Sequence, residues 1–309
     1  MRKTFNIDFI KAFKPALICY AAFLLVGIII TCIFGVNLDI NFKGGTRITY
    51  SYTGELDYTK TEALIEKTID KDVTVSESTG LAGDSKKLVI TLVGTDSLST
   101  EAQQNLAKAL TKEYKSNTFE LYDSNSVNPS VAGAFFTKSI AAVAFAGILV
   151  VAYVGVRFRK IGGVSAGLTA FAALFLDVLV AFFACAIFRL QIDSNFMAVI
   201  LTILGYSLND TIVIYDRIRE NKSIMPKAST EELVNESLNK VKVRTIVTSI
   251  TTLMAIIMII VVSELFGLTS LRSFAIPMVF GMLSGCLSSL FISAPLWTLW
   301  KNYSAKKAR

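Results

Sequence analysis

Six apolar stretches, each close to the length of a membrane span, constrain the fold of this chain more than any other feature. A helix needs about 20 residues to cross the roughly 30 Å hydrocarbon core of a bilayer. With 53% hydrophobic residues, the 309-residue chain is also too apolar for an ordinary soluble domain. The stretches are residues 16–34, 135–156, 164–188, 196–215, 245–262 and 274–299. We therefore predict an α-helical membrane protein with six transmembrane helices.

The first stretch follows four basic residues within the first 14 positions, as does the apolar segment of a secretory signal peptide. Residues 16–34 are longer than such a segment, and no Ala-x-Ala cleavage site follows Phe34. We therefore interpret residues 1–35 as a cytoplasmic N-terminus and a retained first membrane helix.

Basic residues gather in alternate connections between the stretches and so indicate the orientation of the chain. Lys-rich and Arg-rich loops resist translocation and stay in the cytoplasm. Residues 157–160, the connection 216–243 and the tail 301–309 are rich in Lys and Arg, whereas the other short loops hold only Arg189 and Arg272. We predict a multi-pass protein with both termini and the loop 216–243 in the cytoplasm.

The formal net charge of +7 is unevenly distributed. Residues 39–123 carry 14 acidic and 10 basic side chains, so the basic excess lies in the membrane part and its cytoplasmic loops. Membrane topology accounts for a charge segregated in this way, which argues against nucleic acid as a partner.

The sequence contains no histidine, which excludes a Ser-His-Asp triad, a histidine zinc site and an imidazole proton relay. Its four cysteines all lie in apolar stretches. We predict no enzyme activity, no cofactor and no metal site, and any proton chemistry must use carboxylates and water.

Residues 36–133, between the first two stretches, are a polar segment long enough for a separate extracytoplasmic domain. Alternating β-branched and aromatic residues predict strands, and apolar residues at helical spacing predict helices. The predicted strands are residues 41–52, 73–77, 86–93 and 118–122, and the predicted helices are residues 58–69 and 99–114, the latter capped by Ser99. The order β-α-β-β-α-β predicts an α+β domain of the ferredoxin-like type. Residues 134–300 then form the bundle of the other five helices.

Glycine and proline mark the two points where the chain leaves and re-enters the membrane. Gly44 and Gly45 follow the first helix, and a double glycine suggests a bend or bulge. Pro129 precedes the second helix and marks a turn.

Residues 229–239 form an amphipathic pattern on the cytoplasmic side, after Pro226. We expect this segment to lie along the inner membrane surface or against a partner.

Two acidic residues lie within apolar stretches, where a charge is expensive and usually functional. Asp177 falls near the middle of the third stretch; it is either a neutral acid hydrogen-bonded to a neighbouring helix or part of a transport path. Asp210 falls in the fourth stretch beside Asn209, with Tyr206 one turn earlier. These polar neighbours can hydrate a titrating acid.

Arg244, at the start of the fifth stretch, is the candidate partner of Asp210. Thr248 follows it one turn later, on the polar face of that helix. The fourth and fifth helices are antiparallel, so both charges enter the bilayer from the same side. We predict a pair that exchanges between an ion pair and a protonated acid as water access changes. The alternatives are a fixed structural ion pair, or an Arg244 that only anchors the helix end at the headgroups.

Three segments resemble the SecD/SecF family of protein-export membrane proteins, which is itself similar to the resistance-nodulation-division (RND) exporters. Residues 205–221 (GYSLNDTIVIYDRIREN) are similar to the family's signature in the fourth helix, and residues 244–253 (RTIVTSITTL) to that in the fifth. Residues 41–46 (NFKGGT) are similar to the Asp-Phe-x-Gly-Gly-Thr that follows the first helix. Six helices and one large external domain match the family over nearly the whole chain.

The resemblance implies a location in the bacterial cytoplasmic (inner) membrane and a role in late steps of polypeptide translocation, driven by an ion gradient. The implied partners are SecD, the SecYEG channel and the translocating unfolded polypeptide. Asp210 and Arg244 match the family's proton-pathway pair. The chain departs from the family pattern at Asn41, which replaces the usual Asp, and at Asp177, which lacks a preceding His.

The sequence leaves two points open: the coupling ion and the choice between three functions. The coupling ion can be a proton or sodium. The same helix plan also fits half of an RND-type small-molecule exporter, and a purely structural assembly subunit is a third reading.

Overall fold

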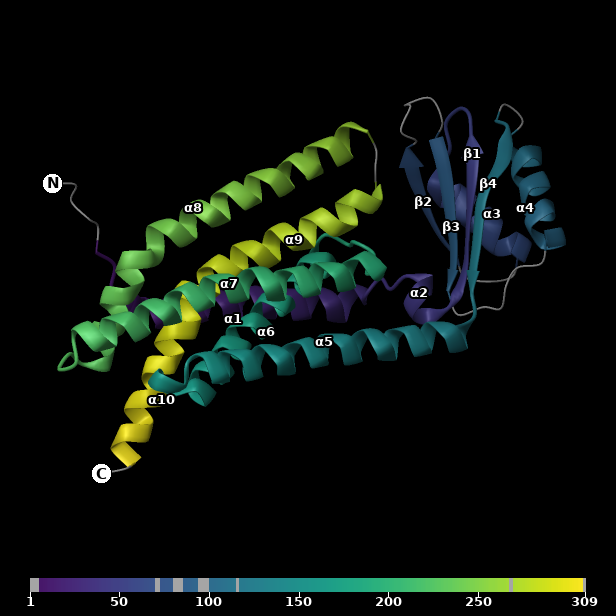
Figure 1. The fold of residues 1–309 in the computed structure, drawn as a ribbon. Coiled ribbons are helices and arrows are strands. Elements are labelled where there is room, and N and C mark those ends of the chain that lie inside the picture. Colours follow the sequence, from purple (N-terminus) through teal and green to yellow (C-terminus); the bar gives the residue numbers. More distant parts are fainter. Residues whose placement is uncertain are drawn as a thin grey trace.

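The computed structural model describes residues 6–69, 73–79, 86–93, 100–114, 117–266 and 269–307. These residues form a bundle of long helices with a small sheet domain at one end (Figure 1). Both ends of the chain lie at the opposite end of the bundle (Figure 1).

Six helical segments of the described chain are long and apolar enough to cross a membrane, so all six predicted spans are confirmed. They make this a multi-pass membrane protein. Five are single helices: α1 (Phe9–Phe34), α5 (Pro129–Arg157), α6 (Gly163–Ile187), α7 (Ser194–Ile224) and α8 (Thr230–Leu265). A short 3₁₀ turn, η1 (Arg159–Ile161), joins α5 to α6. The sixth span consists of α9 (Thr269–Ser288), a π-helical turn η2 (Ser289–Ser293) and α10 (Ala294–Lys307).

The sheet domain lies between α1 and α5 in the chain. Its elements are α2 (Ile40–Lys43), β1 (Gly45–Tyr52), α3 (Tyr58–Ile69), β2 (Thr74–Thr79), β3 (Lys86–Val93), α4 (Thr100–Glu113) and β4 (Phe119–Val127). The four strands form an antiparallel sheet in the order β2-β3-β1-β4. Alternate residues of the central strands, such as Ile48 and Ile90, pack against Ile65 of α3 and Leu106 of α4. The period of two in the strands therefore places their apolar side chains on the face that the helices cover.

One predicted strand of this domain has different bounds in the structure. Residues 41–43 were predicted as the start of a strand but belong to the helical turn α2, and the strand begins only at Gly45. The reason is local, because Gly44 ends α2 at a φ of 78° and redirects the chain. The predicted cap Ser99 lies outside the described residues.

The predicted turn residues meet where the sheet domain joins the bundle. A Cβ on Gly44 would lie only 2.6 Å from the Cα of Pro129. Pro129 opens α5 behind its cap Asn128, whose side chain accepts a hydrogen bond from the backbone N–H of Ser130. Gly44 is thus required both for its positive φ and for the close approach of the outgoing and returning chain.

Most of residues 216–243, predicted as the cytoplasmic connection between the fourth and fifth spans, is helical. Helix α7 continues to Ile224 and α8 begins at Thr230, capped by Ser229. The amphipathic residues 229–239 are the cap and first turns of α8. Their apolar side chains are covered from within the chain, as Leu233 and Leu238 share a core cluster with Phe9 and Ile218.

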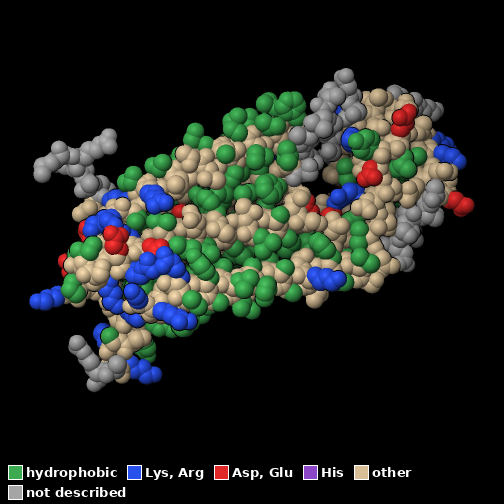
Figure 2. Space-filling view, viewed as in Figure 1, with side chains coloured by type: hydrophobic (Ala, Val, Ile, Leu, Met, Phe, Trp, Pro, Cys, Tyr) green, Lys and Arg blue, Asp and Glu red, His purple; other side chains and the backbone are tan. Residues whose placement is uncertain are grey.

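Side-chain type divides the surface into zones. Figure 2 shows hydrophobic side chains over the middle of the bundle and most Lys and Arg side chains at the end opposite the sheet domain. This distribution matches a bundle that spans a membrane, with its basic end on one side and the sheet domain on the other.

Candidate functional site

Asp210 lies in α7, where this helix faces α8 and α9. Asp210 is 4% exposed, and its Oδ2 atom has no hydrogen-bond partner among the described residues. Thr245 of α8 is also buried, and its hydroxyl oxygen likewise lacks a described partner. Buried polar atoms are nearly always hydrogen-bonded, and exceptions gather at functional sites or where water binds. Asp210 and Thr245 thus place one such atom each on α7 and on α8.

Arg244, next to Thr245, is the basic residue whose charge acts on Asp210. Its charge acts electrostatically on the carboxylate, but no contact of 4.0 Å or less joins the two among the described residues. The predicted pairing is therefore present as an attraction across the helix interface, without a closed ion pair. Such a gap leaves the carboxylate able to take up a cation or proton.

A cleft of about 560 Å³ opens between α7 and α8 and reaches Arg244. It is lined by Val213, Asp216, Arg217, Glu220, Lys240, Val241 and Arg244. Val213, Arg217 and Glu220 lie three, seven and ten residues after Asp210, so they continue its face of α7. The cleft is polar and large enough for several water molecules. It gives water a route from the basic end of the bundle to Arg244 of α8 and to Val213 of α7, which lies one turn from Asp210.

Tyr206 and Ser249 close the site on the other side. The Tyr206 hydroxyl donates a hydrogen bond of 3.1 Å to the Ser249 Oγ, which ties α7 to α8 one turn beyond Asp210. Along α7, Asp210 thus lies between the hydrogen bond from Tyr206 to Ser249 and the polar cleft.

Asp177 lies at the centre of a second polar cluster and is fully buried. Its carboxylate accepts hydrogen bonds from three serine hydroxyls: Ser284 at 2.6 Å, Ser207 at 2.7 Å and Ser288 at 2.9 Å. Tyr20 of α1 extends the cluster, because its hydroxyl donates to the Ser284 carbonyl oxygen at 2.9 Å. The Asp177 carboxylate therefore joins α6, α7 and α9, and Tyr20 links α1 to the cluster through Ser284.

Small residues allow these helices to come close enough for the serines to reach Asp177. A Cβ on Gly285 of α9 would lie 2.9 Å from the Cβ of Ser207, and one on Gly281 would lie 2.1 Å from the Cδ1 of Ile203. Side chains at these two positions would push α9 away from α7.

The remaining predicted site residues lie elsewhere. Asn209 is exposed on α7 and faces away from the buried site. Thr248 is exposed, and its hydroxyl donates to the carbonyl oxygens of Arg244 and Thr245 within α8. The polar residues of α8 that are buried at this level are Thr245 and Ser249. The predicted polar face, marked by Thr248, is therefore rotated by part of a turn from the buried one.

Ser207, Ser288 and Tyr20 were not predicted as site residues. The available signal was the spacing of Ser284 and Ser288, four apart within an apolar stretch. Among the described residues no group of three or more His, Cys, Asp or Glu could hold a metal ion.

The root of the sheet domain is fixed to the bundle by a third polar cluster. Asp39, 1% exposed, forms an ion pair with Arg47 of β1 and accepts a hydrogen bond of 2.7 Å from Asn41. Arg47 also donates to the side chain of Gln191, in the connection between α6 and α7, at 3.3 Å.

Backbone contacts strengthen this junction. The Asp39 N–H donates to the Ile192 carbonyl oxygen at 3.0 Å, and the Ile192 N–H donates to the Asn37 carbonyl oxygen at 2.8 Å. Asp193 follows and caps α7. Burial raises the pKa of Asp193, and the nearby charge of Asp39 adds to this rise. The first turn of the helix that carries Asp210 is therefore linked directly to the root of the sheet domain.

Comparison with known proteins decides the family. The family model "Protein export membrane protein SecD/SecF, C-terminal" matches residues 106–303, well over half of the chain. The chain belongs to the SecD/SecF family. A SecD/SecF relative from Alicyclobacillus acidocaldarius, the protein translocase subunit SecF, is 32% identical over 306 residues, which are 98% of this chain and 96% of the relative.

Other SecD/SecF relatives combine two parts in one protein. The protein translocase subunit SecDF of Bacillus subtilis is 34% identical over 97% of this chain, which covers 39% of that protein. The crystal structure of SecDF from Thermus thermophilus, described as a translocon-associated membrane protein, has a TM-score of 0.81 and 25% identity over 98% of this chain, which covers 40% of the SecDF chain. These relatives support a role in Sec protein export and an association with SecD.

Proposed function

We propose that this chain is an ion-coupled, non-enzymatic subunit of the Sec export machinery, in which a proton or sodium ion bound at Asp210 drives late steps of polypeptide translocation. The observation that carries the proposal is the buried Asp210 carboxylate, which has one oxygen without a hydrogen-bond partner among the described residues. The charge of Arg244 acts on it, and Val213, one turn along α7, lines a polar cleft that also reaches Arg244.

The electrostatics of this site favour two states. With Asp210 ionised, attraction draws Arg244 out of the cleft toward the carboxylate and narrows the interface between α7 and α8. With Asp210 neutralised by a proton or a bound cation, the attraction is lost and Arg244 returns to the hydrated cleft. Ion binding then shifts the balance between two arrangements of α7 and α8.

The junction at Asp39 and Ile192 supplies a route from this shift to the sheet domain. Helix α7 carries Asp210 and begins directly after the residues that bond to the root of the domain. Because helices and paired backbone segments are stiff, a tilt of α7 displaces residues 37–39 and with them β1. We propose that this displacement moves the domain relative to the membrane.

The proposed topology places residues 36–133 outside the cytoplasmic membrane as a ferredoxin-like domain, with residues 1–35, 134–300 and 301–309 as the first helix, the remaining bundle and the cytoplasmic tail. The gathering of Lys and Arg at the end of the bundle that carries both termini supports a cytoplasmic location of that end (Figure 2). In this orientation the sheet domain is positioned to contact polypeptide emerging from the SecYEG channel.

An exposed stripe on α7 supports SecD as the partner within the membrane. Ala198, Thr202, Gly205 and Asn209 are exposed at spacings of three to four residues. A polar Asn in the middle of a span is costly against lipid, whereas small and polar residues at this spacing suit contact with another helix. The fused SecDF relatives contain a second part that can supply that helix.

The deciding experiment replaces Asp210 by Asn in membranes that contain the SecD partner and the channel. We expect the variant to assemble normally but to lose the part of translocation that depends on the ion gradient, because Asn cannot ionise. Separate proton and sodium gradients identify the coupling ion. The matched control is Asp123→Asn on the exposed strand β4, which should behave like the unchanged protein. Full gradient-dependent translocation by Asp210→Asn would refute coupling and favour the structural assembly role.

A further inference from the structure

The sixth span is much longer than a membrane requires. It covers 37 residues from Leu271 to Lys307, or about 55 Å at 1.5 Å per residue, against about 30 Å of hydrocarbon. The span is therefore about 25 Å longer than a straight crossing of the hydrocarbon needs. At the π-helical turn η2 the helix changes direction, and α10 diverges from the bundle at its basic end (Figure 1).

One face of α10 packs against the bundle. Trp297 is 3% exposed and lies in the core cluster with Tyr215, and Thr298 is buried. Asn302 donates a hydrogen bond of 3.0 Å to Glu231 of α8. These contacts fix the rotation of α10 about its axis.

The opposite face of α10 is a continuous exposed stripe that lines a hollow of about 740 Å³. Its residues are Leu296, Leu299, Trp300, Tyr303, Ser304 and Lys307, at spacings of three and four. Trp300 and Tyr303 are 45% and 70% exposed. Helical spacing places all six on one side of the helix, so the stripe is a single surface.

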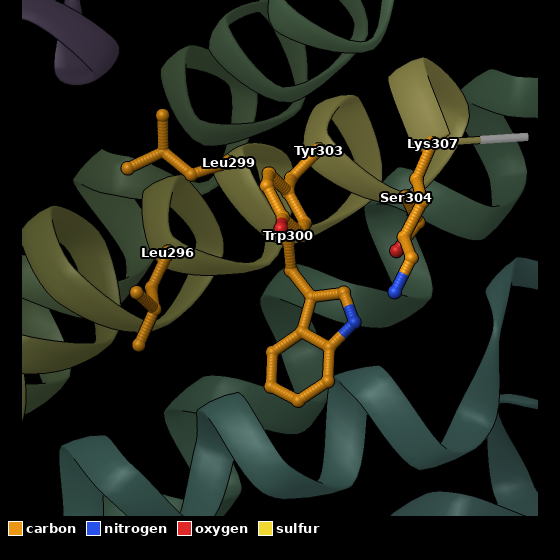
Figure 3. Close-up of a pocket in the computed structure, with 6 residues that line it drawn as sticks. All are labelled: Leu296, Leu299, Trp300, Tyr303, Ser304 and Lys307. Atoms are coloured by element: carbon orange, nitrogen blue, oxygen red, sulfur yellow. The ribbon is translucent and has the colours of Figure 1, made fainter. Parts of the chain in front are cut away.

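The polarity of this stripe changes along its length. Leu296 and Leu299 form one end, and Ser304 and Lys307 form the other, with Trp300 between them (Figure 3). The Lys307 side chain reaches back alongside Ser304, so that its ammonium group, the Ser304 hydroxyl and the indole nitrogen of Trp300 lie on the same side (Figure 3). All three groups are hydrogen-bond donors.

We propose that this stripe binds an anionic phospholipid. The phosphate lies on the donors of Trp300, Ser304 and Lys307, and the acyl chains run along Leu299 and Leu296. The order of donors and apolar side chains matches the order of headgroup and acyl chain, and Trp and Tyr prefer this depth of the bilayer. Lys306 and Lys307 make the site electrostatically complementary to an anionic lipid and unfavourable for a cationic partner.

The chain offers its own reporter for this site. It has only two tryptophans, and Trp297 is buried, with an indole N–H that has no hydrogen-bond partner in the described part of the chain. Trp297→Phe therefore removes one signal without removing a hydrogen bond, and Trp300 fluorescence then reports on the stripe alone. Because Trp297 packs against Tyr215, a modest loss of thermal stability is expected, and an unchanged circular dichroism spectrum shows that the helices are intact.

The experiment places full-length Trp297→Phe protein in lipid nanodiscs that contain bromine-labelled phosphatidylglycerol or, separately, bromine-labelled phosphatidylcholine at the same mole fraction. We expect phosphatidylglycerol to quench Trp300 with an apparent affinity about fivefold higher, the contribution of one Lys near an anionic lipid. Lys307→Gln should abolish this preference, whereas the control Lys227→Gln, exposed at the same end of the bundle, should retain it.

Two results would overturn the proposal. Equal quenching by the two lipids would mean that the stripe contacts lipid without selecting the headgroup. Quenching by neither lipid, with Trp300 emission that instead depends on protein concentration, would assign the stripe to a second copy of the chain.

Discussion

The hydroxyl of Ser207 donates a hydrogen bond of 2.7 Å to the carboxylate of Asp177, and Ser207 lies one helical turn before Asp210 on the same helix. The buried serine cluster and the candidate ion site therefore share α7. A movement of α7 relative to α6 would strain the bond to Asp177. The two acids that the sequence singles out are thus coupled by one short stretch of helix.

Replacing Asp177 separates its hydrogen-bonding role from its charge. Asp177→Leu leaves the hydroxyls of Ser207, Ser284 and Ser288 without their acceptor, at a cost of about 1–3 kcal/mol for each hydroxyl that finds no other partner. Asp177→Asn keeps one carboxamide oxygen as acceptor and should lose much less. Thermal unfolding in detergent measures both variants.

The same pair of variants tests whether Asp177 takes part in ion transfer. If Asp177 is a structural acceptor, Asp177→Asn retains gradient-dependent translocation. If it belongs to the ion path, the Asn variant folds normally but loses that activity, because a carboxamide cannot exchange protons.

Gly285 controls how closely α9 approaches α7. In Gly285→Val the added side chain meets Ser207, where even a Cβ would lie at 2.9 Å, and overpacking of this kind costs about 1–3 kcal/mol. We expect a lower unfolding temperature and, because the helices separate, loss of the bond between Ser207 and Asp177. Gly133→Val is the control, since a Cβ on Gly133 meets nothing within 4 Å. Equal loss of stability in both variants would contradict this account.

Much of the architecture followed from local sequence pattern. The six spans were predictable because a run of about 20 apolar residues has few alternatives to a membrane helix. The helix Tyr58–Ile69 and the strand Lys86–Val93 were predicted with the bounds that the structure has, because apolar periodicity marks both. The close contact of Gly44 with Pro129 also accords with their prediction as turn residues.

The polar partners were not predictable in the same way. Which serines reach Asp177 depends on the faces along which α6, α7 and α9 meet, and a single helix does not encode that choice. The same uncertainty of rotation placed Thr248 at the site, where the structure has Thr245 and Ser249 buried. The apolar side of residues 229–239 is covered from within the chain, and an amphipathic pattern alone does not say what covers its apolar face.

Gly205 tests the proposed partner surface on α7. It is exposed, and a Cβ added to it meets nothing within 4 Å in this chain. Gly205→Leu should therefore leave the stability of the isolated chain unchanged. If a SecD helix packs on the stripe, the added bulk should weaken the association about tenfold or more, as an overpacking cost above about 1.4 kcal/mol implies.

Co-purification over a series of SecD concentrations in mixed detergent micelles measures this effect. Gly133→Leu on α5 is the matched control, because its Cβ also meets nothing within the chain. Association that is weakened equally by both substitutions, or by neither, would place the partner on another face.

Arg47 tests the junction between the sheet domain and the bundle. Arg47→Ala leaves the Asp39 carboxylate buried without its cation and removes the bond to Gln191. Loss of one partner of a fully buried pair costs about 3–5 kcal/mol. Because the Arg47 side chain is 30% exposed, we expect a smaller cost here, confined to local opening of the junction.

Hydrogen exchange of residues 186–193 in the full-length protein should become faster, and gradient-dependent translocation should fall while ion binding at Asp210 persists. Adding Asp39→Asn to Arg47→Ala removes the uncompensated charge and should restore part of the protection. Faster exchange without any loss of translocation would show that the junction holds the domain in place but does not transmit the movement of α7.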